Sequence, residues 1–554
     1  MIDLDLAPIG NCSIASLIDR QGRHVWCCAP RVDSDPVFSL LLSDREPEAD
    51  AALGVWAVDM EGLAEAKQGY LRNTPILRTE LIDENGCRLE IIDFAPRYRQ
   101  HGRVYRPTAM IRLIRPLGGA PMIRIRLRPA AEWGARPAER TSGSNHIRYA
   151  ASDVTLRLTT DCPVSHILTE RWFRLEEPLA LFLGPDEPFD GDISSTCNRM
   201  LADTRRYWME WVRTLAVPLE WQTAVIRAAI TLKLCAYEET GAIVAALTTS
   251  IPEHADSGRN WDYRYCWVRD AYYVVQALNR LGAVDILENY LNFLRNLVAR
   301  SGGGKVQPVY GVGLEPALTE RIIDTLPGYR GMGPVRCGNQ AHEHDQHDAY
   351  GQIVLSSVQA FFDERLLRTA TVDDFRALEQ VGERAFALYD QPDAGLWEFR
   401  TRASVHTYSS LMCWAACDRL ANAAQHIAPP LQADFTGHRL AGKLPRARDL
   451  EVERVERVER AAVSLGRKQR RQEAVLVAGP HQFLAMIESV RHFGTIADSL
   501  NRNQARRDAA SFAEQDVVGR DSRPRPRRLD VDLQRTEAVM QRVGYAPALD
   551  TNAQ

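Results

Sequence analysis

The 554-residue sequence predicts an antiparallel β-sandwich followed by an all-α domain. Short alternating or branched apolar stretches recur through about the first 200 residues, and polar turn signals separate them. Near Thr204 the apolar pattern changes to the period of an α-helix, about 3.6 residues. The composition changes again after residue 428, because all 11 Trp and all 11 Cys lie at or before Cys417. These observations divide the chain into a β part, an α part and an atypical tail.

Residues 1–200 are expected to form the N-terminal sandwich domain. Turn-forming segments such as Glu84-Asn85-Gly86 and Ser142-Gly143-Ser144 separate its short strands. Many short strands joined by polar turns favour an antiparallel sandwich over alternating β and α units. The clearest expected strands are Ile111 to Ile114, Ile123 to Leu127, Val154 to Leu158 and Leu179 to Leu183.

Residues 201–218 are expected to form a linker helix, and residues 219–428 a helical domain. Three loops in this part, 249–268, 301–346 and 390–404, are rich in aromatic or charged residues, and loops on a rigid scaffold often carry the chemistry. Helices are expected, with no strands between them, at Asp270–Leu281, Ala283–Arg300, Ala349–Phe362, Asp374–Tyr389 and Ser409–His426.

Composition excludes several classes of protein. Hydrophobic residues make up 45% of the chain, which is enough for a sizeable core, and a net charge of −4 gives no basic excess for nucleic acid. The apolar runs, such as Gly241 to Leu247, are far shorter than the ~20 residues of a membrane-spanning helix. No secretory signal is visible, and the 11 cysteines lack metal-type spacing, so we expect a reduced, cytoplasmic protein.

Residues 429–554 form an Arg-rich tail of a different kind. They carry 20 Arg and 2 Lys against 17 acidic residues, a net charge of +5, and contain no Trp or Cys. Val452-Glu453-Arg454 repeats as far as Arg460, and residues 523–528 are a basic proline run. One interpretation is a divergent extension with a charged helix over 451–475. The abrupt loss of aromatic residues favours the other, a frame-shifted or disordered segment.

The densest candidate for chemistry is the segment 257–270, directly before an expected helix. It interleaves four aromatic residues with three Arg and two Asp. A sugar ring stacks its C–H face on aromatic rings, and its hydroxyls pair with Asp and Arg, so this combination indicates a carbohydrate site. The alternative is a buried ion-pair network that holds a loop in place.

The segment 393–400 contains a second candidate, Glu398, beside Trp397. A carboxyl group against an apolar ring keeps its proton more readily, as a general acid requires. The alternative is a surface glutamate paired with Arg400. His342, His344 and His347 fit neither one helix face nor the usual zinc spacings, so no metal site is expected.

Several motifs occur along the chain in a specific order. They include Ile9-Gly10-Asn11-Cys12, Ile92 to Arg97, the segment that ends in Arg269-Asp270, Gly328 to Gly331, Pro334 to Asn339, Trp397-Glu398 and Met412-Cys413-Trp414. This ordered set resembles glycoside hydrolase family 15, the group of glucoamylases and bacterial trehalases. The resemblance covers about residues 1–428, and residues 429–554 do not match it.

The resemblance implies an N-terminal β-sandwich and a catalytic (α/α)6 barrel, of which residues 219–428 are the N-terminal part. It implies an inverting glycoside hydrolase that cleaves α-glucosidic bonds and releases glucose from non-reducing ends, with no cofactor. By position, Glu398 is expected to be the general acid and Trp397 its aromatic neighbour.

The same resemblance implies a substrate-binding set for the terminal glucose. Arg269 and Asp270 are expected to clamp this glucose, and Tyr263 and Trp267 to form its stacking platform. The expected partner is an oligosaccharide or disaccharide α-glucoside, rather than a nucleic acid or a membrane.

The sequence departs from the family pattern in its last part. No counterpart of the general base, the second carboxylate that activates water, is found. The helices expected before His426 are too few to close a barrel, so we expect an incomplete one. Without a base, water attack loses a contribution of about 10²–10⁴-fold, and we expect weak or no hydrolase activity. The first hypothesis is a glucoamylase-like enzyme; a trehalase and an inactive carbohydrate-binding protein stay open, as does the oligomeric state.

Overall fold

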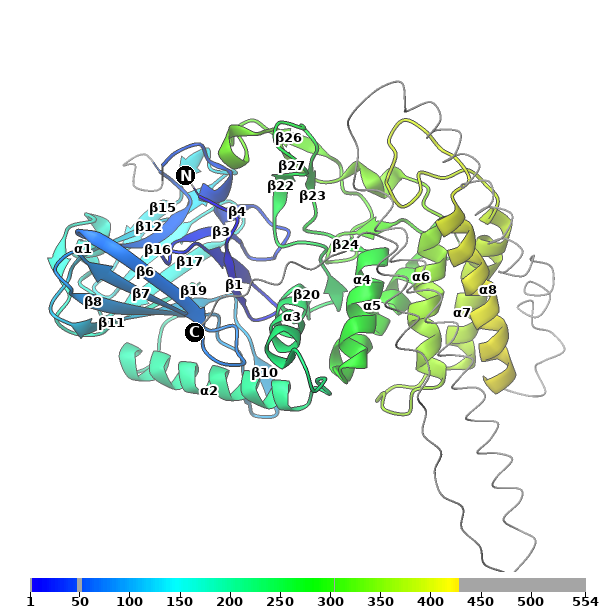
Figure 1. Ribbon diagram of the computed structural model, residues 1–554, viewed down its shortest axis with the longest axis horizontal. Helices are drawn as coiled ribbons and strands as arrows, with labels where there is room; N and C mark the ends of the chain where they lie inside the picture. Colours follow the sequence, from blue (N-terminus) through cyan, green and yellow to red (C-terminus); the bar gives the residue numbers. More distant parts are fainter. Residues whose placement is uncertain (1, 47–51, 303, 428–554) are drawn as a thin grey trace, which may run out of the picture. The chain divides into compact units, whose positions relative to one another are not determined.

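The computed structural model describes residues 2–46, 52–302 and 304–427, so the predictions for residues 429–554 lie outside it. An antiparallel, sheet-rich domain comes first, and a helical region follows (Figure 1). The prediction of a β part followed by an α part is therefore confirmed. None of the described helices is long and apolar enough to cross a membrane.

Two antiparallel sheets make up most of the β domain. The first runs in the order β15 (Glu139–Ser142), β16 (His146–Ala150), β17 (Thr155–Thr160), β19 (Leu179–Pro185), β11 (Met110–Gly118), β8 (Arg88–Phe94), β7 (Leu77–Asp83) and β6 (Leu63–Tyr70). The second runs in the order β1 (Ala7–Gly10), β2 (Ala15–Ile18), β3 (His24–Cys28), β5 (Val55–Met60), β12 (Met122–Arg128) and β18 (Phe173–Arg174), and β4 (Pro36–Phe38) pairs with β3. Smaller elements are η1 (Leu40–Leu42), the pair β9 (Tyr98–Gln100) and β10 (Arg103–Tyr105), the pair β13 (Ala130–Ala131) and β14 (Arg136–Pro137), and α1 (Val164–Leu168).

The two sheets share one apolar core. Trp56 and Ile125 of the second sheet belong to the same buried cluster as Leu81 and Ile114 of the first. Strand β7 shows the underlying pattern, because its alternate residues from 77 to 83 are buried and those between them are partly exposed. Successive side chains of a strand point to opposite faces, so alternation of this kind gives the sheet one apolar face for the core.

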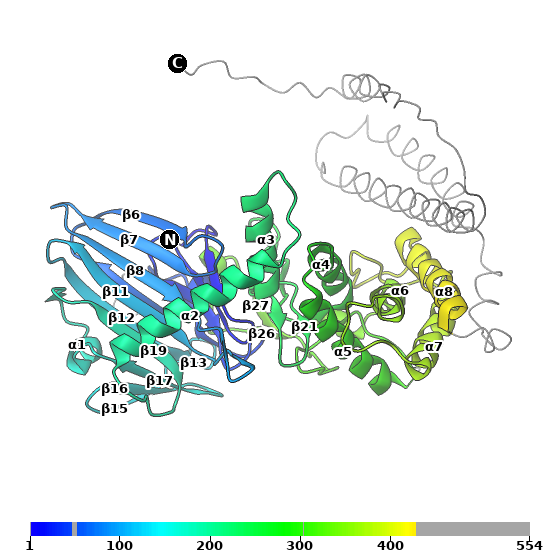
Figure 2. The ribbon, with the colours of Figure 1, turned by 90° about the horizontal axis from the view of Figure 1, so that it is seen from below.

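Helix α2 (Ile193–Arg213) lies beside β11 and β19 of the first sheet (Figure 2). It begins earlier than the expected linker helix at 201–218 and ends at Arg213. Asp192 caps it, since its carboxylate accepts a hydrogen bond from the Ser195 backbone N–H at 2.7 Å. Cys197 and Met200 of its first turns pack with Phe182 of β19. The expected start was too late, although Ile193, Cys197, Met200 and Leu201 already follow helical spacing.

Six α-helices form the helical region within residues 219–427: α3 (Gln222–Leu234), α4 (Val268–Arg280), α5 (Val284–Ser301), α6 (Asp348–Ser357), α7 (Val372–Leu388) and α8 (Thr407–Ile427). All six contribute to one buried apolar cluster, for example through Ile230, Val275 and Ile353. The last five agree with the five helices expected between residues 270 and 426, although the turn η4 (Val358–Phe361) ends the α6 stretch. The (α/α)6 barrel itself stays a prediction.

The expectation that no strands lie between these helices is wrong. Short antiparallel pairs join β20 (Ala236–Tyr237) to β21 (Ala242–Ile243), β22 (Thr249–Pro252) to β23 (Asn260–Asp262), β24 (Cys266–Trp267) to β25 (Val309–Tyr310) and β26 (Arg321–Ile323) to β27 (Val335–Cys337). Strands of this length are too short to show an alternating pattern in sequence. Two single turns, η2 (Tyr329–Gly331) and η3 (Gln340–Glu343), complete the described elements.

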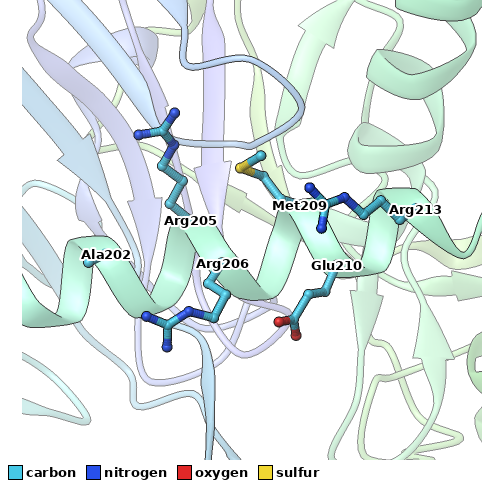
Figure 3. A pocket seen from close by; sticks show the side chains of 6 residues that line it. All are labelled: Ala202, Arg205, Arg206, Met209, Glu210 and Arg213. Carbon is cyan, nitrogen blue, oxygen red and sulfur yellow. The ribbon is translucent and has the colours of Figure 1, made fainter.

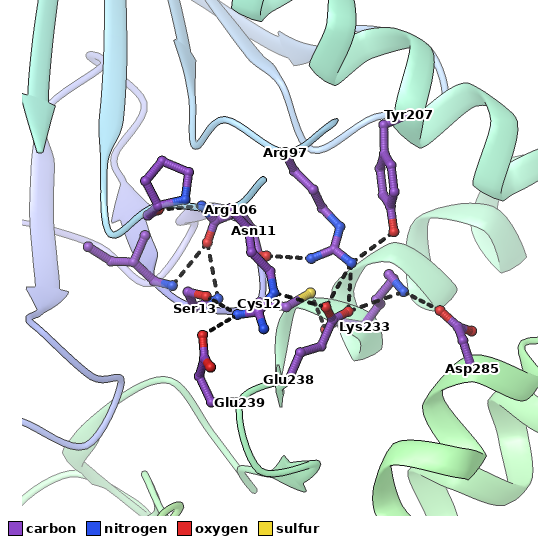
Figure 4. A network of polar contacts seen from close by, with 12 residues as sticks. Asn11, Cys12, Ser13, Arg97, Arg106, Tyr207, Lys233, Glu238, Glu239 and Asp285 are labelled. Carbon is purple, nitrogen blue, oxygen red and sulfur yellow. Dashed lines mark hydrogen bonds and ion pairs between the residues drawn. The ribbon is translucent and has the colours of Figure 1, made fainter. Parts of the chain in front are cut away.

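A buried polar network joins the β domain to the helical region (Figure 4). Arg97, just after β8, donates through Nη2 to both carboxylate oxygens of Glu238, at 2.7 and 2.9 Å, and to the Tyr207 hydroxyl at 2.8 Å. Lys233 of α3 lies with its Nζ 3.6 Å from the same carboxylate and donates to Asp285 at 2.9 Å. Buried charges are stable only when paired, so this network fixes α3 and β20 against the β domain.

Candidate active site

The aromatic segment 257–270 has two parts with different contacts. One part forms a buried ion pair within the segment, and the other forms hydrogen bonds with Glu398. Asp262 and Arg264 are fully buried and form a two-pronged ion pair, with Nε–Oδ1 at 2.9 Å and Nη2–Oδ2 at 2.8 Å. The Arg264 guanidinium also lies over the Trp133 ring, 4.9 Å from its centre. The geometry of Asp262 and Arg264 therefore supports the alternative interpretation, a buried ion pair that holds the loop in place.

The other half of the segment brings Trp267 and Arg269 to Glu398. The Trp267 indole Nε1 donates to Glu398 Oε1 at 2.7 Å, and Arg269 Nη2 donates to the same oxygen at 3.1 Å. Strand β24 ends at Trp267 and α4 begins at the next residue, so the strand-to-helix turn projects both side chains toward one carboxylate. Glu398 thus forms one hydrogen-bonded unit with Trp267 and Arg269, which precede it in sequence by 131 and 129 positions.

Asp393 anchors the loop that carries Glu398. Its Oδ2 accepts hydrogen bonds from the His347 backbone N–H at 2.9 Å and from the Ser409 hydroxyl at 2.6 Å, which ties the loop to the start of α6 and to α8. Glu398 itself has a positive φ of 54°, and its backbone N–H donates to the Gly395 carbonyl at 3.0 Å. A non-glycine residue in this region is uncommon and is held by its surroundings, so the backbone of Glu398 is fixed by the turn.

The sequence neighbours of Glu398 have different surroundings from Glu398 itself. Trp397 is 64% exposed, and the ring that donates a hydrogen bond to Glu398 is that of Trp267. A role for Trp397 beside the substrate stays a prediction. Arg400 does not pair with Glu398, because its guanidinium forms bonds of 2.7 and 3.0 Å with Glu320 and lies over a tryptophan ring. Adjacent side chains on an extended or turning backbone point in different directions, and the turn at residues 395–398 separates them.

Asp270 and Tyr263 lie in the same electrostatic surroundings. Desolvation raises the pKa of Asp270, although its side chain is 45% exposed, and the carboxylates of Glu398 and Asp348 raise the pKa further against the opposing charge of Arg269. Burial likewise raises the pKa of Tyr263 to about 12, together with the carboxylate of Glu398. The Tyr263 and Trp267 rings lie 5.5 Å apart between centres and are tilted by 55°. Tyr263 is partly exposed, whereas Trp267 is buried, with 1% of its surface exposed.

Sequence reasoning missed the polar residues at the start of α6. Gln346 Oε1 and Asp348 Oδ2 accept hydrogen bonds from Arg269 Nη1 at 2.8 and 3.2 Å. Gln352 donates to Asp348 at 3.0 Å and to the Tyr408 hydroxyl at 3.1 Å. In sequence, this segment is distinguished by its histidines, and no short-range signal links Asp348 to an arginine 79 positions earlier.

Several buried polar atoms around this group have no hydrogen-bond partner in the described structure. Buried polar groups nearly always find a partner in protein, water or ligand, so these atoms have capacity for further hydrogen bonds. They include Gln346 Nε2, Asp348 Oδ1, Gln352 Oε1 and Asp393 Oδ1.

The surface hollow on α2 lacks these properties (Figure 3). Its lining contains three arginines and one glutamate but no aromatic ring. A sugar site combines ring faces with a few directed polar groups, so the candidate site is the Trp267–Arg269–Glu398 group instead. Among the described residues, no cluster of His, Cys, Asp and Glu is arranged to hold a metal ion.

Comparison with known proteins agrees with these features. The family model described as Glycosyl hydrolases family 15 matches residues 221–446, and a model described as Trehalase-like, N-terminal matches residues 5–171. Residues 221–446 of the chain are therefore similar to glycosyl hydrolases family 15. The resemblance to this family predicted from the motifs is confirmed, and its match reaches beyond the expected end near residue 428.

Similar proteins include three named Trehalase. That of Thermoplasma volcanium is 28% identical over 428 residues, which are 76% of this chain and 66% of that protein. That of Mycolicibacterium smegmatis is 30% identical over 445 residues, 75% of this chain and 65% of that protein. That of Thermoplasma acidophilum is 29% identical over 410 residues, 73% of this chain and 68% of that protein. The chain thus spans about two thirds of the length of these relatives.

Proposed function

We propose that this chain is a glycoside hydrolase whose substrate is trehalose, the α-linked glucose disaccharide, cleaved with inversion. The observation that carries the proposal is the group in which Trp267 and Arg269 both donate to Glu398. The three similar proteins are named Trehalase, which favours trehalose over the glucoamylase substrate that the sequence suggested first. An aromatic ring, an arginine and two carboxyl groups match what a terminal glucose needs.

Each residue has a chemical part in the proposed reaction. Glu398, as the general acid, gives its proton to the glycosidic oxygen as the bond to the departing glucose breaks. The Trp267 and Arg269 donors then stabilise the carboxylate that remains. Arg269 and Asp270 hold the hydroxyls of the retained glucose, and Tyr263 supplies ring surface to it. Trp267, which is buried, acts through its hydrogen bond to Glu398.

The second half of the reaction needs a carboxylate that activates water on the opposite face of the sugar. No such general base is assigned among the described residues. Because of this, we expect weak turnover compared with the trehalases that the chain resembles. Turnover equal to that of a longer relative under the same conditions would contradict this expectation.

The test compares glucose release from trehalose and from maltotriose by the purified chain. We expect release from trehalose only, with kcat/KM falling about 10²–10⁴-fold in Glu398→Gln, since a general acid contributes about that much. Glu343→Gln is a matched control, because this glutamate is 62% exposed and lies outside the group around Glu398. Unchanged activity of Glu398→Gln would remove Glu398 from the mechanism, and faster release from maltotriose would restore the glucoamylase hypothesis.

A binding measurement separates an enzyme from a carbohydrate-binding protein. Isothermal titration of trehalose into wild type and Glu398→Gln should show binding in both, since the substitution keeps the shape of the side chain. Saturable binding without any hydrolysis by the wild type would favour the inactive binding protein. Absence of both binding and hydrolysis would reject the proposed substrate.

A further inference from the structure

The two ends of the Arg269 guanidinium have different partners. Nη2 donates to Glu398 at 3.1 Å, whereas Nη1 donates to Gln346 at 2.8 Å and to Asp348 at 3.2 Å. The Arg269 side chain is only 12% exposed, so water offers it few alternatives. Its orientation toward Glu398 is therefore set by what holds the other end.

Asp348 is the charged residue among the partners of Arg269 Nη1, and its own carboxylate is held by a hydrogen bond from Gln352. Its side chain is 1% exposed, and it lies in the first turn of α6. Gln352, one turn later, donates to it at 3.0 Å and also contacts the Tyr408 hydroxyl of α8. Since α6 packs against both α4 and α8 (Figure 1), Asp348 has a defined place between these helices.

We propose that Asp348 is a positioning residue that holds Arg269 on Glu398 and balances the arginine charge, so that Glu398 keeps its proton until the glycosidic bond breaks. The proposal rests on the proposed hydrolase function and deepens it. An unbalanced guanidinium at 3.1 Å would favour the ionised carboxylate, which has no proton to give. Asp348 offsets that effect by supplying a negative charge to the opposite end of the guanidinium.

Other titratable and charged groups near Glu398 also influence its ionisation, and the test leaves them unchanged. Asp270 lies on α4 next to Arg269, with 3.9 Å between the Arg269 Nε and its carboxylate. Tyr263 lies on the aromatic segment, and His344 lies on the loop before α6, where burial lowers the pKa of its imidazole. Arg400, on the loop of Glu398, is paired with Glu320, and Lys305 with Asp345.

The test measures pH profiles of Asp348→Asn, Asp348→Glu and the control Asp345→Asn. Asp345 is three residues away and 64% exposed, and it pairs with Lys305 at 2.9 Å. Asn keeps the size of Asp348 but removes its charge. We expect kcat to fall about tenfold or more, with a smaller change in KM, and the alkaline limb of kcat/KM to move down by about half a pH unit or more.

The glutamate variant separates charge from position. Asp348→Glu keeps the charge but displaces it from Arg269, so kcat should fall while the alkaline limb stays at the wild-type pH. The proposal is overturned if Asp348→Asn lowers kcat without moving the limb, or if the Asp345→Asn profile moves as much. If Asp348→Asn does not fold, as judged by thermal melting, wild-type kcat in Asp348→Glu overturns the positioning role.

A binding readout keeps this test independent of turnover. N,N-dimethyl-1-deoxynojirimycin is a glucose analogue with a permanent positive charge, so the pH dependence of its affinity reports ionisation of groups in the protein. Its affinity should rise with pH as Glu398 ionises, and the rise should come at lower pH in Asp348→Asn and be lost in Glu398→Gln. Coincident wild-type and Asp348→Asn curves would overturn the role of Asp348, whereas no binding to the wild type at any pH would reject the glucose site itself.

Discussion

The burial of His24 predicts that the β domain loses stability in mildly acidic solution. The imidazole is fully buried, stacks on Trp56 with ring centres 5.0 Å apart, and shares a hydrogen bond of 2.8 Å with the Ser16 hydroxyl. Burial lowers the pKa of His24 from 6.5 to about 4, and the positive charge of Arg112 adds to this effect against the opposing carboxylate of Asp93. His24 is therefore neutral in the folded protein at neutral pH.

The sign and size of the effect follow from proton linkage. Well above pH 6.5 neither the folded nor the unfolded chain protonates this residue, so it contributes no pH dependence there. As the pH falls from 6.5 toward 4, the unfolded chain takes up a proton that the folded chain does not, and stability decreases. The difference between 6.5 and about 4, at 1.36 kcal/mol for each pKa unit, corresponds to a loss of about 3 kcal/mol.

The assay is urea unfolding followed by tryptophan fluorescence at several pH values between 7.5 and 4. His24→Asn should be less stable than wild type at pH 7.5, because it loses the stacking on Trp56, but its stability should fall less steeply below pH 6.5. His101→Asn is the control, since His101 is exposed in the turn between β9 and β10, and Asn tolerates its positive φ of 50°. Parallel profiles for wild type and His24→Asn would refute the burial of a neutral His24.

Three further substitutions test the fold and the site. Arg97→Met should lower the free energy of unfolding by about 3–5 kcal/mol in chemical denaturation, because it leaves the buried Glu238 carboxylate without its main partner. Asp270→Asn should raise the melting temperature at pH 7 while weakening trehalose binding in titration calorimetry. The raised pKa of Asp270 means that its protonated form stabilises the fold at low pH and that this contribution is lost as the pH rises and the residue ionises. Gly241→Ala should lower the melting temperature far more than Gly86→Ala: both glycines have positive φ, but a Cβ at 241 would lie 2.0 Å from a carbonyl oxygen of α5, whereas nothing lies within 4 Å of one at 86.

Local sequence determined the type and order of most elements. The alternating stretches between residues 111 and 183 lie in strands β11, β12, β17 and β19, and the helical periods after residue 270 lie in α4 to α8. Both patterns arise because one face of an element must pack on a core, and that requirement is written in neighbouring residues. The pairs β20 to β27 escaped prediction because two to four residues are too few to show a period.

The composition of the candidate site was also visible in sequence, since residues 257–270 and 393–400 stood out by their aromatic and charged residues. Which of those residues meet was decided only by the tertiary structure. Arg264 turns inward to Asp262, whereas Arg269 turns to Glu398, although both arginines belong to one segment and either could have paired with a carboxylate. Asp348 could not be connected with Arg269 from sequence, because contacts between distant positions depend on how helices pack, and packing is a property of the whole core rather than of any local pattern.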